Sequence, residues 1–408
     1  MEQQQLIPHL FRSEYRKIVA VLCHHFGIDH IQAAEDIASE TFHTALDTWS
    51  YKGIPGNPKG WLYTVAKNKA ANYLKRNKIF SNKVAPALQQ FPISVNEEDI
   101  DLSDKNISDS QLQMLFTVCH PSISSEAQVG LALRILCGFG IEEIADAFLT
   151  NKETINKRLF RAKEKLRAER IEIKFPGKEE IANRLDAVLT TIYLLFNEGY
   201  YSESNNQVVR KDFCLEAMRL AYLLIENEQT NTPRVNALLS LMCFYSSRFE
   251  ARVGKQGEMV LYEAQDENLW NNELIAEGSY FLKQASIGNE LSKYHLEAAI
   301  AYWHTVKADT KEKWENILQL YNRLLQVEYS PVAALNRTYA LSKTNGKQEA
   351  IREAEKLNLS SNHFYFTLLG ELYKGIDNVK AKNNFQHAFE LAKTQTDKQV
   401  IQKQIDGL

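Results

Sequence analysis

The sequence predicts an all-α protein with two small helical domains, the second containing a helix-turn-helix, followed by a C-terminal helical-repeat region. Two observations predict this class. Apolar residues recur at helical spacing in the N-terminal segments, and the alternation of apolar and polar residues that is typical of strands is rare. From about Pro176 onward, long amphipathic helices follow one another between Gly, Pro and Asn residues, which is the pattern of a helical-repeat array.

The composition is that of a soluble globular protein. The 408 residues include 48 Lys and Arg, 51 Asp and Glu and 44% hydrophobic residues, with a formal net charge of −3. No apolar run approaches the length of a membrane span, and the first residues lack the pattern of a signal peptide. We therefore expect a cytoplasmic protein that does not bind a membrane. Five scattered cysteines without a Cys-x-x-Cys pair indicate neither a disulfide framework nor a zinc site, and we expect no metal and no cofactor.

Residues 31 to 49 predict a helix with one packed face and one acidic face. The packed face consists of apolar residues at helical spacing: Ile31, Ala34, Ala38, Phe42, Ala45 and Trp49. On the other face Asp36 and Glu40 lie one turn apart, and like charges at that spacing slightly destabilise an isolated helix. This arrangement favours a basic partner surface that covers both acids, although an ordinary solvated acidic face gives the same pattern.

A basic helix is predicted from Pro58 to about Arg76. Asn57 can cap its first turn, and proline suits the first helical position. Residues 59 to 83 contain no acid and seven basic side chains, namely Lys59, Lys67, Lys69, Lys75, Arg76, Lys78 and Lys83. Four aromatic residues are interleaved with them: Trp61, Tyr63, Tyr73 and Phe80. These rings could stack on unpaired bases or belong to the core, and the pattern leaves both interpretations open.

Residues 77 to 106 are expected to form an acidic linker. They hold few apolar anchors, and the segment from 97 to 109 carries six acids, so a packed element is not expected there. Such a linker could occupy the basic walls of a partner, or it could simply set the spacing of the domains on either side.

A helix-turn-helix is predicted over residues 141 to 167. In its second helix, four apolar residues form one stripe that would pack on Ile144 and Phe148 of the first: Ile155, Leu159, Ala162 and Leu166. Thr150 and Glu153 match a capping box, which places the start of the second helix. Residues 151 to 170 hold eight basic residues and three acids, a local net charge of +5, and phosphate is the obvious counter-charge. The alternative is a basic helix that only keeps a surface solvated.

Residues 9 to 76 and 107 to 170 together resemble the two conserved domains of a group 4, extracytoplasmic-function (ECF) bacterial sigma factor of the sigma-70 family. The resemblance rests on three stretches: AEDIASETFHTAL, NPKGWLYTVAKNKAANYLKR, and the segment from His120 to Arg167. It implies a sigma region 2 domain at residues 1–76, the acidic linker at 77–106 and a region 4 domain at 107–175. The partners implied are bacterial core RNA polymerase and promoter DNA.

The same resemblance implies roles for individual residues. Asp36 and Glu40 are implied to bind polymerase. The residues implied to lie near the melted non-template strand of the minus-ten element are Trp61, Lys67, Asn68, Lys75 and Arg76. Those implied to lie in or beside the major groove of the minus-thirty-five duplex are Lys152, Thr154, Asn156, Lys157, Arg158 and Arg161. One departure is visible, because Asn72 stands where many relatives carry an acid, and this puts the local pairing of Arg76 in doubt.

Residues 176 to 408 are expected to form a tetratricopeptide-like extension. The clearest unit spans residues 362 to 391, with its spacing carried by Leu369, Gly370, Tyr373, Ala381, Phe385 and Ala388. A weaker unit runs from Pro331 to Leu357, and further helix pairs are expected at about 212 to 251 and 312 to 343. Stacked pairs of this kind leave a concave groove, so a protein or peptide partner is one expectation.

The extension also resembles the long helical extension of one subgroup of these sigma factors, on motifs that include FNEGY, EAMRL, LIAEG and SPVAALNR. This implies a sigma factor whose activity is controlled by its own C-terminal part. Two alternatives remain open. One is a tetratricopeptide adaptor that carries a helix-turn-helix DNA-binding module. The other is a catalytic pocket built from the polar residues Glu198, Arg210, Arg248, Arg252, Asp266, Glu277 and His304. No acid–base pair, nucleophile signature or glycine-rich phosphate loop supports an enzyme, so we expect none.

Overall fold

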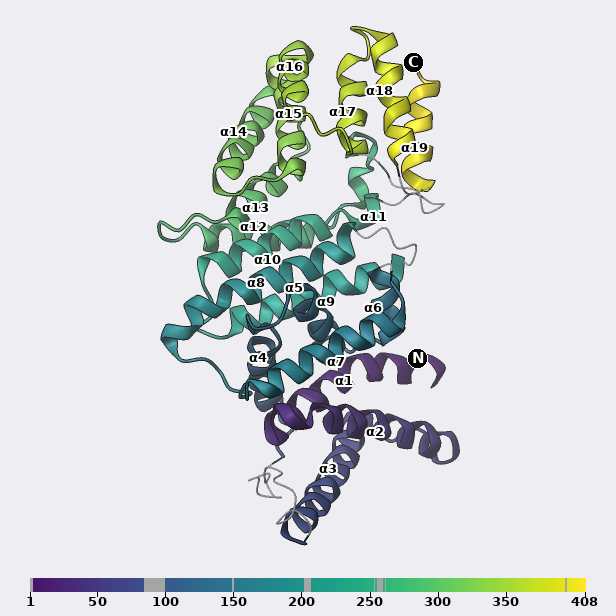
Figure 1. Ribbon diagram of the computed structural model, residues 1–408, viewed down its shortest axis with the longest axis vertical. Coiled ribbons are helices and arrows are strands. Elements are labelled where there is room, and N and C mark those ends of the chain that lie inside the picture. The colour runs from purple at the N-terminus through teal and green to yellow at the C-terminus, as the bar shows by residue number, and fades with distance from the viewer. Residues whose placement is uncertain are drawn as a thin grey trace. The chain divides into compact units, whose positions relative to one another are not determined.

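The computed structural model is helical, and it contains no strand in the residues it describes: 3–83, 100–148, 150–201, 207–252, 254, 260, 262–392 and 395–408 (Figure 1). Side chains are described from residue 10 onward, except within 78–83, 201, 207–210 and 396. This confirms the all-α class. The chain divides into two compact units, Met1–Thr230 and Asn231–Leu408. None of the described helices is both long and apolar enough to cross a membrane.

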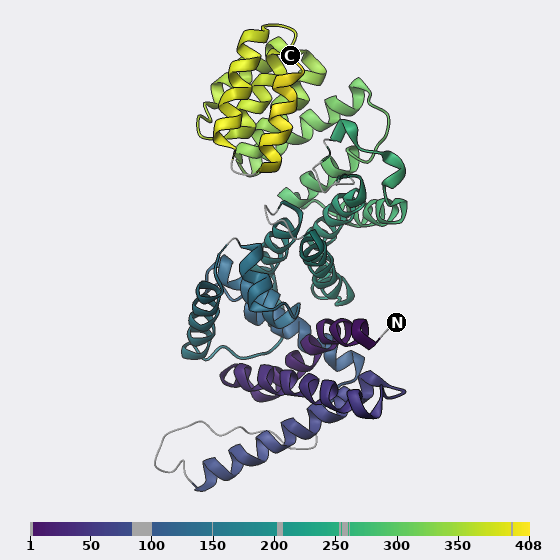
Figure 2. The same ribbon diagram turned by 90° about the vertical axis from the view of Figure 1, so that its right-hand side faces the viewer.

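The first unit begins with three long helices, α1 (Gln3–Phe26), α2 (Ile31–Lys52) and α3 (Pro58–Lys83), with a 3-10 turn, η1 (Ile28–His30), before α2. The predicted apolar stripe of α2 is buried along its whole length, as expected. Helix α3 runs seven residues beyond the expected end, and its C-terminal end projects away from α1 and α2 (Figure 2).

Four helices follow: α4 (Asp104–Val118), α5 (Ser125–Leu131), α6 (Ile141–Ala147) and α7 (Lys152–Ala168), of which α6 and α7 correspond to the predicted helix-turn-helix. A π-turn, η3 (Ala132–Leu136), continues α5. Helix α4 starts inside the segment expected as linker, because Ser103 caps it and accepts a hydrogen bond from the N–H of Asn106. Ile100 and Leu102, just before it, are buried, so this end of the linker is anchored. Residues 84–99 lie outside the described range.

Two further helices, α8 (Lys178–Tyr201) and α9 (Gln207–Glu226), complete the first unit and pack on one another. Helix α8 also packs on α4 and α5. Thr191 in α8 donates a hydrogen bond of 3.0 Å to the side chain of Gln128 in α5, and both residues are buried. The structural boundary therefore falls at Thr230, well past residue 176 where the sequence pattern changes.

The second unit starts with α10 (Pro233–Ser246), which packs on α12 (Asn272–Ala285) and α13 (Lys293–Trp303). Between α10 and α12 lie one short helix and two 3-10 turns: α11 (Phe249–Arg252), η4 (Tyr262–Ala264) and η5 (Glu267–Leu269). A β-carbon at Gly278 would lie 2.8 Å from the ring of Phe244, so the contact between α10 and α12 requires glycine there. Helix α9 pairs with α8 within the first unit and α10 pairs with α12 and α13 within the second, so the boundary between the units falls inside the helix pair expected at 212 to 251.

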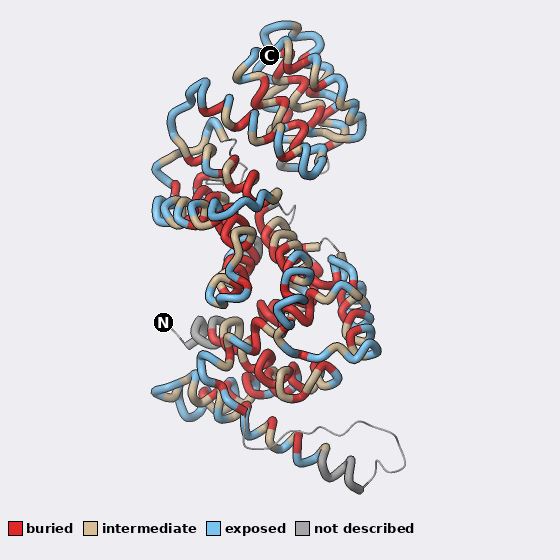
Figure 3. Tube along the Cα trace, turned by 90° about the vertical axis from the view of Figure 1, so that its left-hand side faces the viewer, coloured by how far each residue is buried: buried red, intermediate tan, exposed pale blue. Residues whose placement is uncertain are grey.

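The rest of the second unit is a run of antiparallel helices: α14 (Lys311–Val327), α15 (Pro331–Asn345), α16 (Lys347–Leu357), α17 (His363–Tyr373), α18 (Asn378–Leu391) and α19 (Gln395–Asp406). Helices α17 and α18 form the helix pair predicted at 362 to 391. Gly370 lets them approach, since a β-carbon there would lie 2.7 Å from the ring of Phe385. Within each unit, buried residues line the contacts between neighbouring helices (Figure 3).

Candidate nucleic-acid interface

The start of α7 is fixed by Asn151, whose side chain accepts hydrogen bonds from the backbone N–H of Thr154 at 2.8 Å and from its hydroxyl at 2.9 Å. The prediction that Thr150 and Glu153 form the capping box was wrong by one residue. Asparagine and threonine are both good caps, and the turn places Asn151 at the position whose side chain reaches back to the free N–H groups.

The inner face of α7 carries the predicted stripe, and all four of its residues are buried against the rest of the domain. Helix α7 packs on α6, as the stripe predicted, and also on α5. Ile144 is fully buried, whereas Phe148 is half-buried with the guanidinium of Arg158 over its ring at 5.8 Å. The packed stripe therefore fixes which face of α7 is presented to solvent.

The outer face of α7 brings the predicted duplex-binding residues together. Arg158 is half-buried, and the others are exposed: Lys152, Thr154, Asn156, Lys157 and Arg161. A groove of about 460 Å³ runs between α7 and the start of α5, lined by Ser122, Ser124, Thr154, Lys157, Arg158, Arg161 and Lys165. Cations, hydroxyls and a helix N-terminus are the groups that hold a phosphate in a protein–DNA complex.

The start of α5 already stabilises one negative charge in this groove region. Backbone and Ser124 hydrogen bonds, with Arg158 nearby, hold the pKa of the Glu126 carboxyl below its ordinary value. The cations that line the groove, Lys157, Arg158, Arg161 and Lys165, suit an anionic ligand such as a DNA phosphate.

Several basic residues of α3 are exposed, and its described aromatic residues mostly anchor the helix. Exposed side chains are those of Lys67, Asn68, Lys75 and Arg76. The hydroxyl of Tyr63 donates a 2.6 Å hydrogen bond to buried Glu14, and that of Tyr73 lies 2.7 Å from the ring nitrogen of His30. Trp61 is half-buried and packs edge-on against Trp49 at 5.3 Å. The side chain of Phe80 lies outside the described residues.

The two acids of α2 that the resemblance assigns to polymerase are both exposed. Asp36 accepts a 3.1 Å hydrogen bond from Gln32, one turn earlier in the same helix. Glu40 pairs with Lys69 of α3 at 3.1 Å, and its side chain remains 65% exposed. Weak surface partners of this kind are easily exchanged for those of a binding protein.

Their neighbour Glu35 faces inward and joins the acidic helix to the helix-turn-helix domain. Its side chain is 5% exposed and pairs with Arg134 at 3.0 Å and with Lys163 of α7. Arg167, further along α7, pairs with the carboxylate of Asp29 at 3.4 Å and donates to its carbonyl at 3.0 Å. We call these the α2–α7 contacts. The basic residues of α7 therefore fall into two groups. Lys157 and Arg161 are exposed on the outer face, whereas Lys163 and Arg167 are already paired with Glu35 and Asp29.

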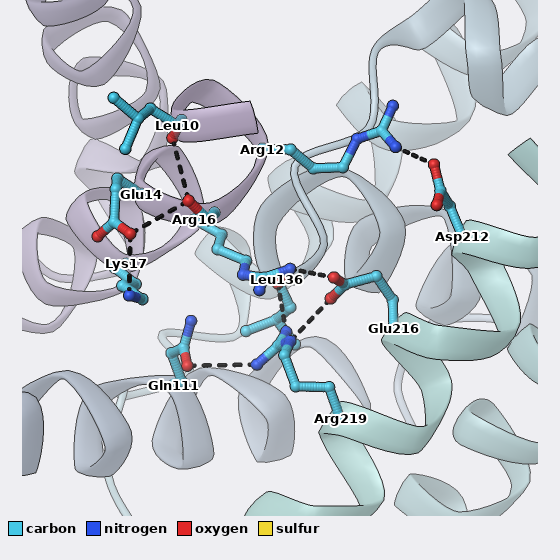
Figure 4. Close-up of polar contacts among 11 residues, drawn as sticks. Leu10, Arg12, Glu14, Arg16, Lys17, Gln111, Leu136, Asp212, Glu216 and Arg219 are labelled. Atoms are coloured by element: carbon cyan, nitrogen blue, oxygen red, sulfur yellow. Dashed lines mark hydrogen bonds and ion pairs between the residues drawn. The ribbon is translucent and has the colours of Figure 1, made fainter. Parts of the chain in front are cut away.

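A second set of ion pairs, which we call the α1–α9 network, joins α1, α9 and the helix-turn-helix domain (Figure 4). Arg12 of α1 pairs with Glu143 of α6 at 3.1 Å and with Asp212 of α9. One turn later, Arg16 pairs with Glu216 of α9, and their side chains are only 11% and 12% exposed. Burial lowers the pKa of Arg16, while the Glu216 carboxylate acts to raise it.

Arg219 extends the α1–α9 network into the helix-turn-helix domain. Its guanidinium donates to Glu216 at 2.7 Å, to the side chain of Gln111 at 3.3 Å and to the carbonyl of Leu136 at 2.7 Å. Gly138, with a φ of +75°, allows the close approach of α1, because a β-carbon there would lie 3.3 Å from the carbonyl oxygen of Arg12. Sequence reasoning missed this network. Only the EAMRL motif at 216 to 220 hinted at Glu216 and Arg219.

The polar residues singled out in the extension are divided between the two units. Glu198 belongs to the first unit, where burial raises its pKa, and Asp266 is an exposed residue that caps η5. Arg248 and His304 both lie close to Tyr262 in the second unit. The side chain of Arg210 is outside the described residues. Among the described residues, no group of three His, Cys, Asp or Glu side chains is placed to hold a metal ion.

Comparison with known proteins agrees with this geometry. Residues 10–79 match sigma-70 region 2, and residues 184–286 match a family of unknown function, DUF6596. An uncharacterized protein of Rhizobium meliloti is 32% identical over 388 residues, covering 93% of this chain and 90% of that protein. The ECF RNA polymerase sigma-E factor of Haemophilus influenzae is 28% identical over 108 residues, covering 26% of this chain and 57% of that factor. No solved structure matches the chain.

The sigma-70 region 2 match covers most of α1, all of α2 and most of α3, and the DUF6596 match begins within α8 and ends just after α12. Sigma factors are transcription initiation factors and do not catalyse a reaction themselves. The chain belongs to the ECF-type sigma factors of RNA polymerase, as a member with a C-terminal extension of the DUF6596 family.

Proposed function

We propose that this sigma factor binds promoter DNA through α7 and α3, binds core polymerase through Asp36 and Glu40, and uses its own extension to control access to the promoter. We assign these three roles to the domains suggested by the sequence, residues 1–76, 107–175 and 176–408, with one change. Helices α8 and α9 work with the sigma domains, since they pack within the same unit. The α1–α9 network is the observation that carries the proposal.

Control is needed because the two promoter elements lie much farther apart than the two proposed DNA-binding surfaces of the first unit. The minus-ten and minus-thirty-five elements are separated by roughly 25 base pairs, which is about 85 Å at about 3.4 Å for each step along the duplex. In the first unit, however, Arg167 of α7 contacts Asp29, and Lys163 contacts Glu35 at the start of α2. The C-terminal half of α7 therefore lies against the start of α2 and the turn before it, so one promoter cannot use both DNA-binding surfaces until the two domains separate.

The extension opposes this separation through α9. Asp212 and Glu216 bind arginines of α1, and Arg219 binds the helix-turn-helix domain on the other side. Removing one partner of a buried ion pair typically costs about 3–5 kcal/mol, because the remaining charge stays buried without compensation. Helix α9 thus acts as a clamp on a closed form, and promoter binding requires its release.

The test is run-off transcription with purified core polymerase and a promoter template that the wild-type protein uses. The double variant Asp212→Asn, Glu216→Gln removes both acids of the clamp, and we expect several-fold more transcript than with wild type. Glu226→Gln, an acid-to-amide change at the exposed end of the same helix, is the matched control and is expected to leave the transcript unchanged. Equal or lower transcription by the double variant would contradict the clamp.

Truncation gives a second, independent test. A chain that ends at Thr230 keeps the first unit whole, whereas one that ends at residue 176 removes α8 and exposes the apolar face of α4 and α5 that it covers. We expect the longer fragment to retain core binding and the shorter fragment to lose solubility or stability. If the shorter fragment kept core binding and stability while the longer one lost them, α8 and α9 would not belong with the sigma domains.

A further inference from the structure

The second unit contains a cluster of cations around a single aromatic ring, that of Tyr262 in η4. The guanidinium carbon of Arg248, which follows α10, lies 5.4 Å from the centre of this ring. The ammonium of Lys313, in the first turn of α14, lies 5.3 Å from the same centre. His304, at the end of α13, packs edge-on against the ring at 5.0 Å, and Trp270 stacks at 6.5 Å.

Both cations are buried without a carboxylate partner among the residues that the structure describes. Arg248 is 6% exposed and Lys313 is 1% exposed. The Lys313 ammonium donates to the hydroxyl of Tyr262 at 2.9 Å and to the carbonyl of Val306 at 2.8 Å, both neutral acceptors. Burying an unpaired charge is costly, and proteins normally place an opposite charge beside it. Within the described part of the chain, an opposite charge is what this cluster lacks.

Several polar atoms of the same cluster are buried without a hydrogen-bond partner: Nε of Arg248, Nε1 of Trp270 and Nδ1 of His304. The first two atoms are donors. Burial, and then the charges of Arg248 and Lys313, lower the pKa of His304 to about 3, so its ring is neutral near pH 7 and one of its two nitrogens is a further donor. Buried donors that lack an acceptor are rare in folded proteins, and each one calls for an explanation.

We propose that this cluster, named here the Tyr262 site, binds the anionic group of a small organic molecule, a carboxylate or a phosphate. Such a group supplies the missing negative charge to Arg248 and Lys313 and the missing acceptors to the unpaired donors. The rings of Tyr262, Trp270 and His304 provide apolar walls for the remainder of the molecule. The site lies wholly within the second unit, so the proposal does not depend on the clamp formed by α9.

A purely structural role for Arg248 makes the opposite prediction about stability. If Arg248 only holds the fold together, replacing it with methionine destabilises the unit. If it is an unoccupied anion-binding residue, an apolar side chain of similar length removes an uncompensated buried charge, and stability is kept or increased. Arg234, at the start of α10, is the matched control, because it pairs with the carboxylate of Glu290 at 2.7 Å.

The experiment measures thermal unfolding of the full chain at constant ionic strength, with sodium chloride exchanged for inorganic phosphate or for benzoate. We expect at least one of the two probes to raise the melting temperature of the wild-type second unit by about 3 °C at saturation. Arg248→Met should lose that rise and should melt in chloride at or above the wild-type temperature. Arg234→Met should melt at a lower temperature but keep the response to the probe.

Three outcomes would overturn the proposal. The first is the absence of any response of the wild-type protein to either probe. The second is a response that Arg248→Met retains in full. The third is an Arg248→Met protein that is unfolded or clearly less stable than wild type in chloride, because that is the behaviour of a structural cation. A response to phosphate alone or to benzoate alone supports the site and identifies the chemical class of its ligand.

Discussion

The buried arginines of the two units differ in their partners. In the first unit Arg16 lies against the carboxylate of Glu216, whereas in the second unit Arg248 lies over an aromatic ring and no carboxylate of the described residues pairs with it. The same contrast occurs along α7, where Lys163 pairs with Glu35 while Lys157 and Arg161 face solvent. A cation whose partner lies within the chain holds the fold in one arrangement, and a cation without one is available to a ligand.

The largest expected effect comes from the open cations of α7. Reversing their charge with Lys157→Glu and Arg161→Glu should reduce promoter-specific transcription more than 100-fold, because two phosphate attractions become repulsions. Core binding should survive, since neither side chain lies near Asp36 or Glu40 in the sequence or on the same helix. Run-off transcription and a core-binding assay check both parts.

The control for that pair is Lys178→Glu, an exposed cation at the start of α8, away from the groove. It should leave transcription within a factor of about two, since a lone exposed charge contributes little. Normal initiation by the double variant of α7 would show that this helix does not read the promoter.

The next effect is a loss of stability when Arg16, the paired arginine of the first unit, is replaced. Arg16→Met leaves Glu216 buried with Arg219 as its remaining partner, and we expect the free energy of unfolding to fall by about 3 kcal/mol. Urea denaturation, with amide hydrogen exchange in α1 and α9 as a local readout, measures this. Arg248→Met serves as the comparison, and an equal loss in both variants would remove the distinction between paired and unpaired cations.

An effect spread over several pH units is the pH dependence of the second unit. Because the pKa of His304 falls from 6.5 to about 3 on folding, the unfolded chain binds a proton that the folded chain does not in this interval. Stability should therefore be complete above pH 6.5 and should fall as the pH is lowered towards 3, by up to about 1.4 kcal/mol for each pH unit. His304→Gln should flatten this slope. An unchanged slope would mean that His304 is not held neutral.

The smallest effect is expected at the surface of α2. Asp36→Lys should weaken core binding about tenfold, which corresponds to about 1.4 kcal/mol. Asp47→Lys, an equally exposed acid three turns later on α2, is the control and should change the affinity little. Equal losses in the two variants would indicate a general charge effect in place of a specific contact.

Short-range patterns in the sequence predicted the helices and their faces. The stripes of α2 and α7 are buried as predicted, because helical spacing alone decides which side chains share a face. The end of α3 and the cap of α7 were misplaced by seven residues and one residue, since competing caps and polar helix ends give weak local signals.

Contacts between residues far apart in the sequence could not be predicted, and the reason is physical. Arg12 and Asp212, and likewise Arg16 and Glu216, are separated by 200 residues, and no local spacing connects two side chains so far apart. The inward orientation of Glu35 was also missed, because it adjoins exposed Asp36 and its role depends on Lys163 of another domain. The cluster around Tyr262 similarly draws on residues from four separate segments.

The most direct test of the closed form is the distance between α2 and α7 in the free protein and in the complex with polymerase. Cysteines introduced at exposed Gln32 and Ala168 accept spin labels for pulsed dipolar spectroscopy, and the five native cysteines are buried. We predict a short distance for the protein alone and an increase of tens of ångströms with core polymerase and promoter DNA. The same short distance in both states would contradict the closed form.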